Sequence, residues 1–114
     1  MKTIAVDFDA TIHEYNGFDG DDPKGVPLPG AREGIRELMK DCRVVIFTAR
    51  KPEFVRRWLE RNGFPALQVT NEKSPSFTVI LDDRGLNFGG NWETAVRQLK
   101  GFRPWWCPNR DPDE

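Results

Sequence analysis

Short apolar runs and stretches with helical spacing alternate along this chain of 114 residues. The apolar runs are rich in β-branched residues, which predicts strands, and they lie at residues 2–8, 42–48, 66–70 and 77–83. Apolar residues three and four apart predict helices with one apolar face, at residues 29–41, 52–63 and 91–100. Strands that alternate with helices favour an α/β fold with a mainly parallel sheet of about four strands and right-handed crossovers.

The ends of two predicted helices carry recognisable signals. Pro52 suits the first turn of the second helix and Gly63 suits its C-terminal cap. Asn91 can cap the last helix, whose apolar stripe contains Trp92 and Leu99. These signals set the helix ends independently of the apolar pattern.

The length indicates one domain, which we place at residues 1–101. Within it, residues 12–30 are rich in Gly, Asp and Pro and predict a loop, which we call the flap. Residues 102–114 form a tail in which Phe102, Trp105 and Trp106 are expected to cover a sheet edge, or otherwise to form an exposed patch for a partner or a second subunit. The end of the tail, "NRDPDE" at residues 109–114, is expected to be disordered.

Composition excludes several classes of protein. A net charge of −1 gives no general attraction to nucleic acid or anionic lipid. The N-terminus lacks a signal-peptide pattern, and the longest conspicuous apolar run, residues 44–47, is too short to span a membrane. Cys42 and Cys107 form no CxxC pair, which favours two thiols in a reducing cytoplasm. We therefore expect a cytoplasmic protein without a membrane segment.

Candidate chemistry gathers after the predicted strands, where ligands bind in open parallel sheets. Asp7 and Asp9 follow the first strand, and their spacing of two residues predicts that they point to the same side. The other strand ends carry polar side chains as well, namely Thr48 with Ala49 and Arg50, then Lys73, then Asp82 and Asp83. Up to four carboxylates are thus expected to converge at one edge of the sheet.

Such a group of acids needs counter-charge. At an effective dielectric constant of about 20, two like charges ~4 Å apart repel by ~4 kcal/mol. A set of oxygen ligands without His or Cys favours Mg²⁺. Carboxylates with a hydroxyl and an ammonium group suit phosphoryl transfer, in which Asp7 attacks phosphorus and a second carboxyl moves protons.

These residues resemble, in order, the four motifs of the haloacid dehalogenase superfamily of phosphohydrolases. "DFDAT" (residues 7–11) is similar to its DxDxT signature, "VVIFTAR" contains the second motif, Lys73 stands for the third, and "ILDDR" for the fourth. The resemblance covers about residues 2–100 and departs at Ala10, where Gly is common. It implies a Rossmann-like α/β/α fold of three layers.

The resemblance also implies a role for each motif residue. Asp7 would be the nucleophile and a Mg²⁺ ligand, and Asp9 the general acid and base that gives the metal its backbone carbonyl. Thr48 and Lys73 would hold phosphate, beside Ala49 and Arg50. Asp82 would be a further metal ligand, and Asp83 would bind the metal through water or orient its neighbours. Two alternatives stay open: Arg50 and Arg84 contact substrate or pair with nearby acids, and His13 is a bystander or a substrate contact.

The flap is too short for a cap domain, so the chain resembles the small capless members of bacteria and phages. The expected function is a Mg²⁺-dependent phosphomonoester hydrolase. Its substrate would be a nucleotide, a sugar phosphate or a polynucleotide end, and a homo-oligomer would help to cover the site. The alternative is a catalytically weak binding or regulatory protein with the same motifs. A receiver domain is disfavoured because its adjacent acids follow the first strand, whereas here the first pair is spaced D-x-D.

Overall fold

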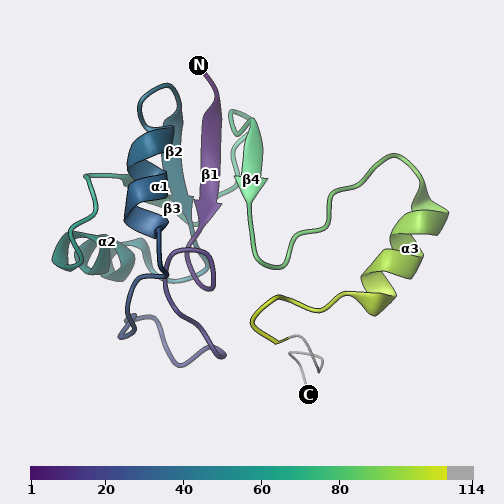
Figure 1. Ribbon diagram of the computed structural model, residues 1–114, viewed down its shortest axis with the longest axis horizontal. Helices are drawn as coiled ribbons and strands as arrows, with labels where there is room; N and C mark the ends of the chain where they lie inside the picture. The colour runs from purple at the N-terminus through teal and green to yellow at the C-terminus, as the bar shows by residue number, and fades with distance from the viewer. Residues whose placement is uncertain (108–114) are drawn as a thin grey trace.

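The computed structural model describes residues 1–107, which form the expected alternation of strands and helices (Figure 1). The strands are β1 (Thr3–Asp7), β2 (Arg43–Phe47), β3 (Gln68–Thr70) and β4 (Val79–Leu81). The helices are α1 (Ala31–Leu38), α2 (Pro52–Arg61) and α3 (Trp92–Gly101). Every predicted element is present, although β3 and β4 are shorter than expected. The predicted disorder of residues 109–114 lies outside the described residues.

The four strands form one parallel sheet in the order β3-β2-β1-β4. In the centre of the sheet, Asp7 of β1 lies opposite Phe47 of β2, and Val6 lies opposite Leu81 of β4. The carboxyl ends of these three strands therefore meet at one edge of the sheet. The predicted fold class, a Rossmann-like α/β protein with a parallel sheet of four strands, is confirmed.

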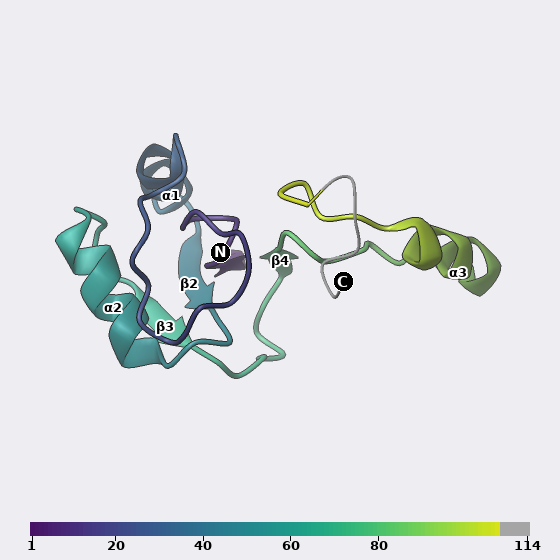
Figure 2. The same ribbon diagram turned by 90° about the horizontal axis from the view of Figure 1, so that it is seen from below.

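Helices α1 and α2 cover the same face of the sheet (Figures 1 and 2). The crossovers through α1 and α2 step in one direction across the sheet, and right-handed connections then place both helices on one side. A single core cluster joins Ile35 of α1 and Trp58 of α2 to Val6, Ile46 and Val69 of the sheet. This shared cluster is the main apolar core of the molecule.

The opposite face of the sheet carries Ala5, Val45 and Phe47, since side chains alternate along each strand. Ala5 and Val45 are buried there. The connection from β3 to β4 crosses this face, and the ring of Phe77 meets the ring of Phe47 at a centroid distance of 6.0 Å. On this face, a connection rather than a helix forms the outer layer, so the expected three layers of helix, sheet and helix are not formed by the described residues.

The helix ends follow the sequence signals. Pro52 begins α2, and Gly63 follows that helix with a φ of 76°, a conformation that glycine adopts without strain. The side chain of Asn91 accepts a hydrogen bond from the backbone N–H of Thr94 at 3.1 Å, which confirms the predicted cap of α3.

The flap is a hairpin-like loop tied to the body of the protein. The backbone N–H of Glu14 donates to Val26, and that of Leu28 donates to Ile12, which pairs the two arms of the flap. The indole N–H of Trp58 in α2 donates to the carbonyl of Gly25 at 2.9 Å. These bonds hold the flap against α2 beside the carboxyl edge of the sheet.

Helix α3 lies apart from the sheet in both views (Figures 1 and 2). In the described part of the chain, no Cα of α3 comes within 8 Å of a residue in another helix or strand. Its predicted apolar stripe is largely open to solvent, with Trp92 69% and Leu99 53% exposed.

None of the three helices that the described residues form is long and apolar enough to cross a membrane.

Candidate active site

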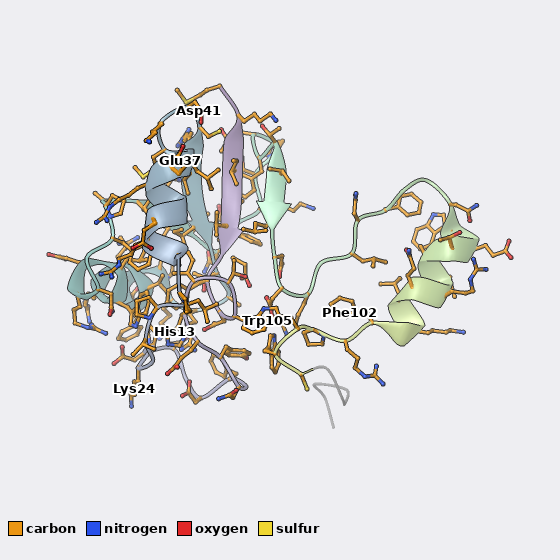
Figure 3. The ribbon with its side chains drawn as sticks, viewed as in Figure 1. His13, Lys24, Glu37, Asp41, Phe102 and Trp105 are labelled. Carbon is orange, nitrogen blue, oxygen red and sulfur yellow. The ribbon has the colours of Figure 1, made fainter. Side chains whose placement is uncertain are left out.

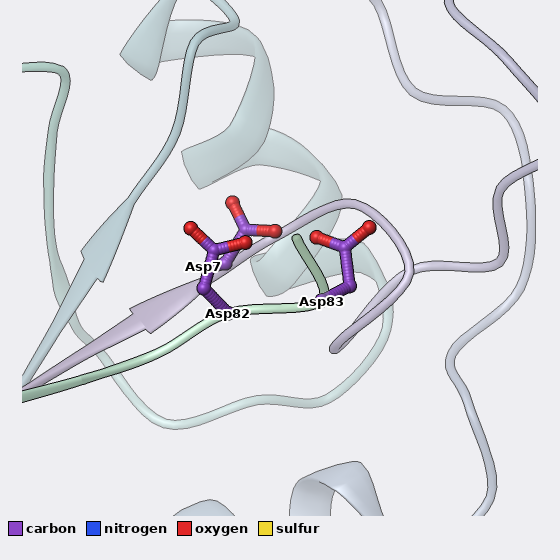
Figure 4. Close-up of side chains that lie close together, drawn as sticks. All are labelled: Asp7, Asp82 and Asp83. Carbon is purple, nitrogen blue, oxygen red and sulfur yellow. The ribbon is translucent and has the colours of Figure 1, made fainter. Parts of the chain in front are cut away.

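Three of the predicted acids come together beyond the ends of β1 and β4. Asp7, Asp82 and Asp83 each offer a carboxylate oxygen, and these oxygens all lie within 4.8 Å of one another (Figure 4). The parallel pairing of β1 with β4 produces this arrangement, because it brings the last residue of one strand beside the residues that follow the other. We call these three side chains the carboxylate cluster, and it can hold a metal ion.

Asp7 is the most perturbed group of the cluster. Its burial, its hydrogen bond with Asp83 and the charges of Asp82 and Asp83 together raise its pKa to about 9. At this pKa, Asp7 carries a proton at neutral pH when no cation is bound. A cation at this position would replace that proton and allow Asp7 to ionise.

Asp9 is not part of the carboxylate cluster, contrary to the expectation that it converges there with Asp7. Strand β1 ends at Asp7, and the carbonyl of Phe8 then accepts hydrogen bonds from the backbone N–H groups of residues 11–13. This tight turn ends the alternation of side chains before Asp9 is reached. Three carboxylates therefore converge, rather than four.

Arg50 and His13 hold the side chain of Asp9. The Arg50 guanidinium donates two hydrogen bonds to the carboxylate, at 2.8 and 3.0 Å, and His13 Nδ1 lies 3.0 Å from Asp9 Oδ1. Burial alone raises the pKa of Asp9, but the hydrogen bonds from His13 and Arg50 outweigh it and lower that pKa. Asp9 is therefore held as a carboxylate.

The proton of His13 can be placed from its partners. The backbone N–H of Gly25 donates to His13 Nε2 at 2.9 Å, so that nitrogen carries no proton. Nδ1 then carries the proton and donates to Asp9. His13 is buried, with its ring stacked on Phe8 at a centroid distance of 5.1 Å, so it links the flap to the first motif.

Arg50 is almost completely buried, with 1% of its surface exposed. Besides Asp9, it donates to the carbonyl of Gly20, and its guanidinium lies 3.6 Å from Asp19. It also lies 5.5 Å from the ring centroid of Phe18. Of the two alternatives for Arg50, the structure contains pairing with acids, which ties the flap to the loop after β2. Its contact with phosphate stays a prediction.

Thr48 and Ala49 follow β2 at the same edge of the sheet as Asp7. Thr48 is buried, and its hydroxyl oxygen accepts the backbone N–H of Arg50 at 3.1 Å, which leaves its hydroxyl hydrogen available as a donor. Ala49 is exposed. The positions of both residues are compatible with the predicted phosphate contacts, which stay predictions.

Lys73 lies in the connection from β3 to β4 and is exposed. It lines a hollow of about 410 Å³ together with Arg43 at the start of β2 and Phe77. In the described residues, no ion pair joins Lys73 to the carboxylate cluster. Lys73 is thus not paired with the acids in the described structure, and its role in holding phosphate stays a prediction.

Ala10 occupies the position where the family resemblance led us to expect glycine. Its φ is 61°, and among the described residues it is the one non-glycine residue with a positive φ. A left-handed conformation costs an L-residue roughly 1–2 kcal/mol. Such strain clusters at functional sites, and here it reverses the chain directly after Asp9.

Sequence reasoning missed the contact of the tail with the site. Trp106 Nε1 donates to Asp83 Oδ2 at 2.6 Å, and Trp105 Nε1 donates to the carbonyl of Ala10 at 2.8 Å. Tyr15 of the flap meets the Trp106 ring edge to face at 5.1 Å. The signal available in the sequence was the Trp-Trp pair after Pro104, which a solvated tail would not need.

Comparison with known proteins supports the fold. No protein-family model matches the sequence, and no curated protein is significantly similar to it. A solved structure of a conserved protein from Bacteroides thetaiotaomicron is similar in fold, with a TM-score of 0.56 and 22% sequence identity. The similarity covers 96% of this chain and 98% of that one. At this identity, the likeness extends to the α/β architecture alone.

Proposed function

We propose that this protein is a Mg²⁺-dependent phosphomonoester hydrolase of the haloacid dehalogenase type, with Asp7 as the nucleophile. The observation that carries the proposal is the convergence of Asp7, Asp82 and Asp83 at the carboxyl edge of a parallel sheet. Thr48, the residue of the second motif, follows the neighbouring strand β2. Strand ends of open α/β sheets are where such proteins bind their ligands.

The donor set of the carboxylate cluster fits Mg²⁺. Asp7, Asp82 and Asp83 would hold the ion, since hard oxygen ligands without His or Cys suit it. The raised pKa of Asp7 supports this proposal, because a bound cation would offset the charges of Asp82 and Asp83 that disfavour its ionisation. When bound, Mg²⁺ would neutralise charge on the carboxylates and on a phosphate group.

The chain's own residues then divide the reaction into two displacements. In the first, an Asp7 oxygen bonds to phosphorus while the bond from phosphorus to the leaving oxygen breaks, which gives an aspartyl-phosphate. The leaving oxygen takes up a proton from solvent. In the second, a water oxygen bonds to the phosphorus of that acyl phosphate while the bond from phosphorus to the Asp7 oxygen breaks. Asp9 accepts a proton from the water, inorganic phosphate is released, and Asp7 is regenerated.

The state of Asp9 matters for the first displacement. Because His13 and Arg50 lower its pKa, Asp9 suits the proton-accepting second displacement better than donation to a leaving group. We therefore expect aryl phosphates, whose leaving oxygens need little protonation, to react much faster than alkyl phosphates. Equal rates for a matched aryl and alkyl phosphate would contradict this assignment of Asp9.

The engagement of Asp9 by Arg50 and His13 also favours a second candidate, a binding or regulatory protein with little turnover. Asp9 is fully engaged by Arg50 and His13, and Lys73 is not paired with the cluster. Such a protein would bind Mg²⁺ and a phosphate group without rapid hydrolysis. Binding without turnover on a broad panel of phosphates would decide in its favour.

One experiment separates the candidates. An aryl phosphate is incubated with wild type, Asp7→Asn and Asp9→Asn, with Mg²⁺ and then with a chelator. We expect activity only in wild type with Mg²⁺, or a small residue of it in Asp9→Asn. Asp22→Asn is the matched control, because Asp22 is an exposed aspartate of the flap. If Asp7→Asn hydrolyses the ester as fast as wild type, Asp7 is not the nucleophile.

The substrate class and the compartment are part of this proposal. A nucleotide, a sugar phosphate and a polynucleotide end all present a terminal phosphate that an open strand edge can accept. A cytoplasmic location would supply both Mg²⁺ and these substrates. A panel of the three classes, assayed by release of inorganic phosphate, ranks them.

A further inference from the structure

The end of the described chain returns to the carboxylate cluster. After β4, the chain runs out to α3 and comes back as residues 102–107, which we call the aromatic segment (Figures 1 and 3). Two indole groups anchor it at the site, Trp105 on the carbonyl of Ala10 and Trp106 on the carboxylate of Asp83. The segment therefore contacts the loops after both β1 and β4.

The carboxylate of Asp83 has partners on both of its sides. Its side chain is 3% exposed, so its oxygens depend on the protein for hydrogen bonds. Asp83 Oδ2 accepts the Trp106 indole N–H, and Arg84 Nε lies 4.0 Å from the same oxygen. A hydrogen bond with Asp7 connects Asp83 to the cluster. Asp83 is thus held between the tail and the nucleophile.

Trp106 is itself fixed by a second element. The ring of Tyr15 in the flap meets it at a centroid distance of 5.1 Å and an interplanar angle of 85°. The flap, the aromatic segment and the loop after β4 therefore meet at one indole ring. A donor positioned in this way restricts the orientation of the carboxylate that it binds.

We propose that Trp106 is a positioning residue of the cation site, which couples the aromatic segment to cation binding. The inference rests on the cation site of the proposed function. Carboxylates that bind a metal are oriented by hydrogen bonds from surrounding groups, and Trp106 gives Asp83 such a bond. Because coupling is reciprocal, the factor by which the docked aromatic segment raises the cation affinity is also the factor by which a bound cation stabilises docking of the segment.

The first test compares two tryptophan substitutions. Trp106→Phe keeps an aromatic ring for Tyr15 but removes the N–H donor to Asp83. Trp105→Phe is the matched control, since it removes an N–H donor to a backbone carbonyl in the same segment. Isothermal titration of Mg²⁺ is expected to give a dissociation constant about 10- to 100-fold higher for Trp106→Phe. The constant for Trp105→Phe is expected to stay within about twofold of wild type.

The second test needs no stable variant. In wild type labelled with ¹⁵N, Mg²⁺ is expected to shift the indole N–H signal of Trp106 in NMR, with a midpoint at the calorimetric dissociation constant. The signal of Trp92, on the distant helix α3, is the internal reference and is expected to stay unchanged. An unshifted Trp106 signal at saturating Mg²⁺ overturns the coupling.

The outcomes separate the inference from the function on which it rests. If wild type binds no Mg²⁺, the cation site of the proposed function fails, and the positioning role falls with it. If wild type and Trp106→Phe bind Mg²⁺ equally well, the cation site stands and the positioning role alone is overturned. Weaker binding by both tryptophan variants also overturns it, because the effect then belongs to the segment rather than to Asp83.

Discussion

Binding of Mg²⁺ to the carboxylate cluster should depend steeply on pH. Burial, the hydrogen bond with Asp83 and the nearby charges raise the pKa of Asp7 to about 9, so at pH 7 only about 1% of the metal-free protein has Asp7 ionised. Removing that proton at pH 7 costs about 2.7 kcal/mol, so Mg²⁺ binding is weaker by this amount than it is to protein with Asp7 already ionised. We expect the Mg²⁺ affinity to rise about tenfold per pH unit from about pH 6 to about pH 9, and then to level off.

Calorimetry measures both consequences of this proton. Titrations of Mg²⁺ near pH 6, 7 and 8 give the affinity, and buffers with different ionisation enthalpies give the number of protons released, expected as about one per ion at pH 7. Asp22→Asn should behave as wild type does. An affinity that is the same at the lowest and the highest pH, with no dependence of the heat on the buffer, would show that no proton leaves Asp7 when Mg²⁺ binds.

The same pKa has the opposite effect on the stability of the metal-free protein. The folded value of about 9 lies above the ordinary value of 3.8, so the stabilisation from Asp7 is complete below about pH 4 and is lost as the pH rises toward 9. Between these limits, the difference in unfolding free energy between wild type and Asp7→Asn should fall by about 1.4 kcal/mol per pH unit. Urea denaturation at a series of pH values measures this slope, and a flat difference would contradict the raised pKa.

Two further substitutions test the contacts that hold the flap, and a third tests helix α1. Arg50→Gln should lower the unfolding free energy by about 3 kcal/mol, because it leaves the mostly buried Asp9 with His13 alone. Gly25→Ala should lower the melting temperature, since a Cβ there would lie 2.9 Å from His13 Nε2, and unchanged stability would show that the flap can move aside. Gly34→Ala is its counterpart: a Cβ there meets nothing within 4 Å, so helix propensity should stabilise α1 by about 0.5–1 kcal/mol, measured by urea denaturation.

The sequence was sufficient to predict an element of the fold where its apolar pattern, its end signals and its place in the sheet agree. Residues 44–47 form a continuous apolar run, which suits a buried central strand. Helix α2 has both a helical stripe and two end signals. The carboxylate cluster followed from topology, since parallel strands bring their carboxyl ends to one edge. These features need no knowledge of distant contacts.

Other features of the fold and the site could not be predicted from the spacing of apolar residues. Asp9 lies outside the carboxylate cluster, and β1 ends at Asp7, two residues before Asp9, where a turn replaces the extended backbone. Strand β4 is short because it lies at the edge of the sheet and pairs with β1 alone. The stripe of α3 was visible, but an apolar pattern does not say which surface covers it. The contact of Trp106 with Asp83 joins residues 23 positions apart and leaves no local pattern.

The separation of α3 from the sheet has a consequence for hydrogen exchange. An isolated helix of ten residues is marginally stable in water, and in the described structure α3 gains no support from another helix or strand. Its amides should therefore exchange with solvent through local opening, much faster than those of β1 and β2, whose exchange requires unfolding of the core. The helix then behaves as a separate cooperative unit, and substitutions on its surface should leave the global unfolding of the sheet unchanged.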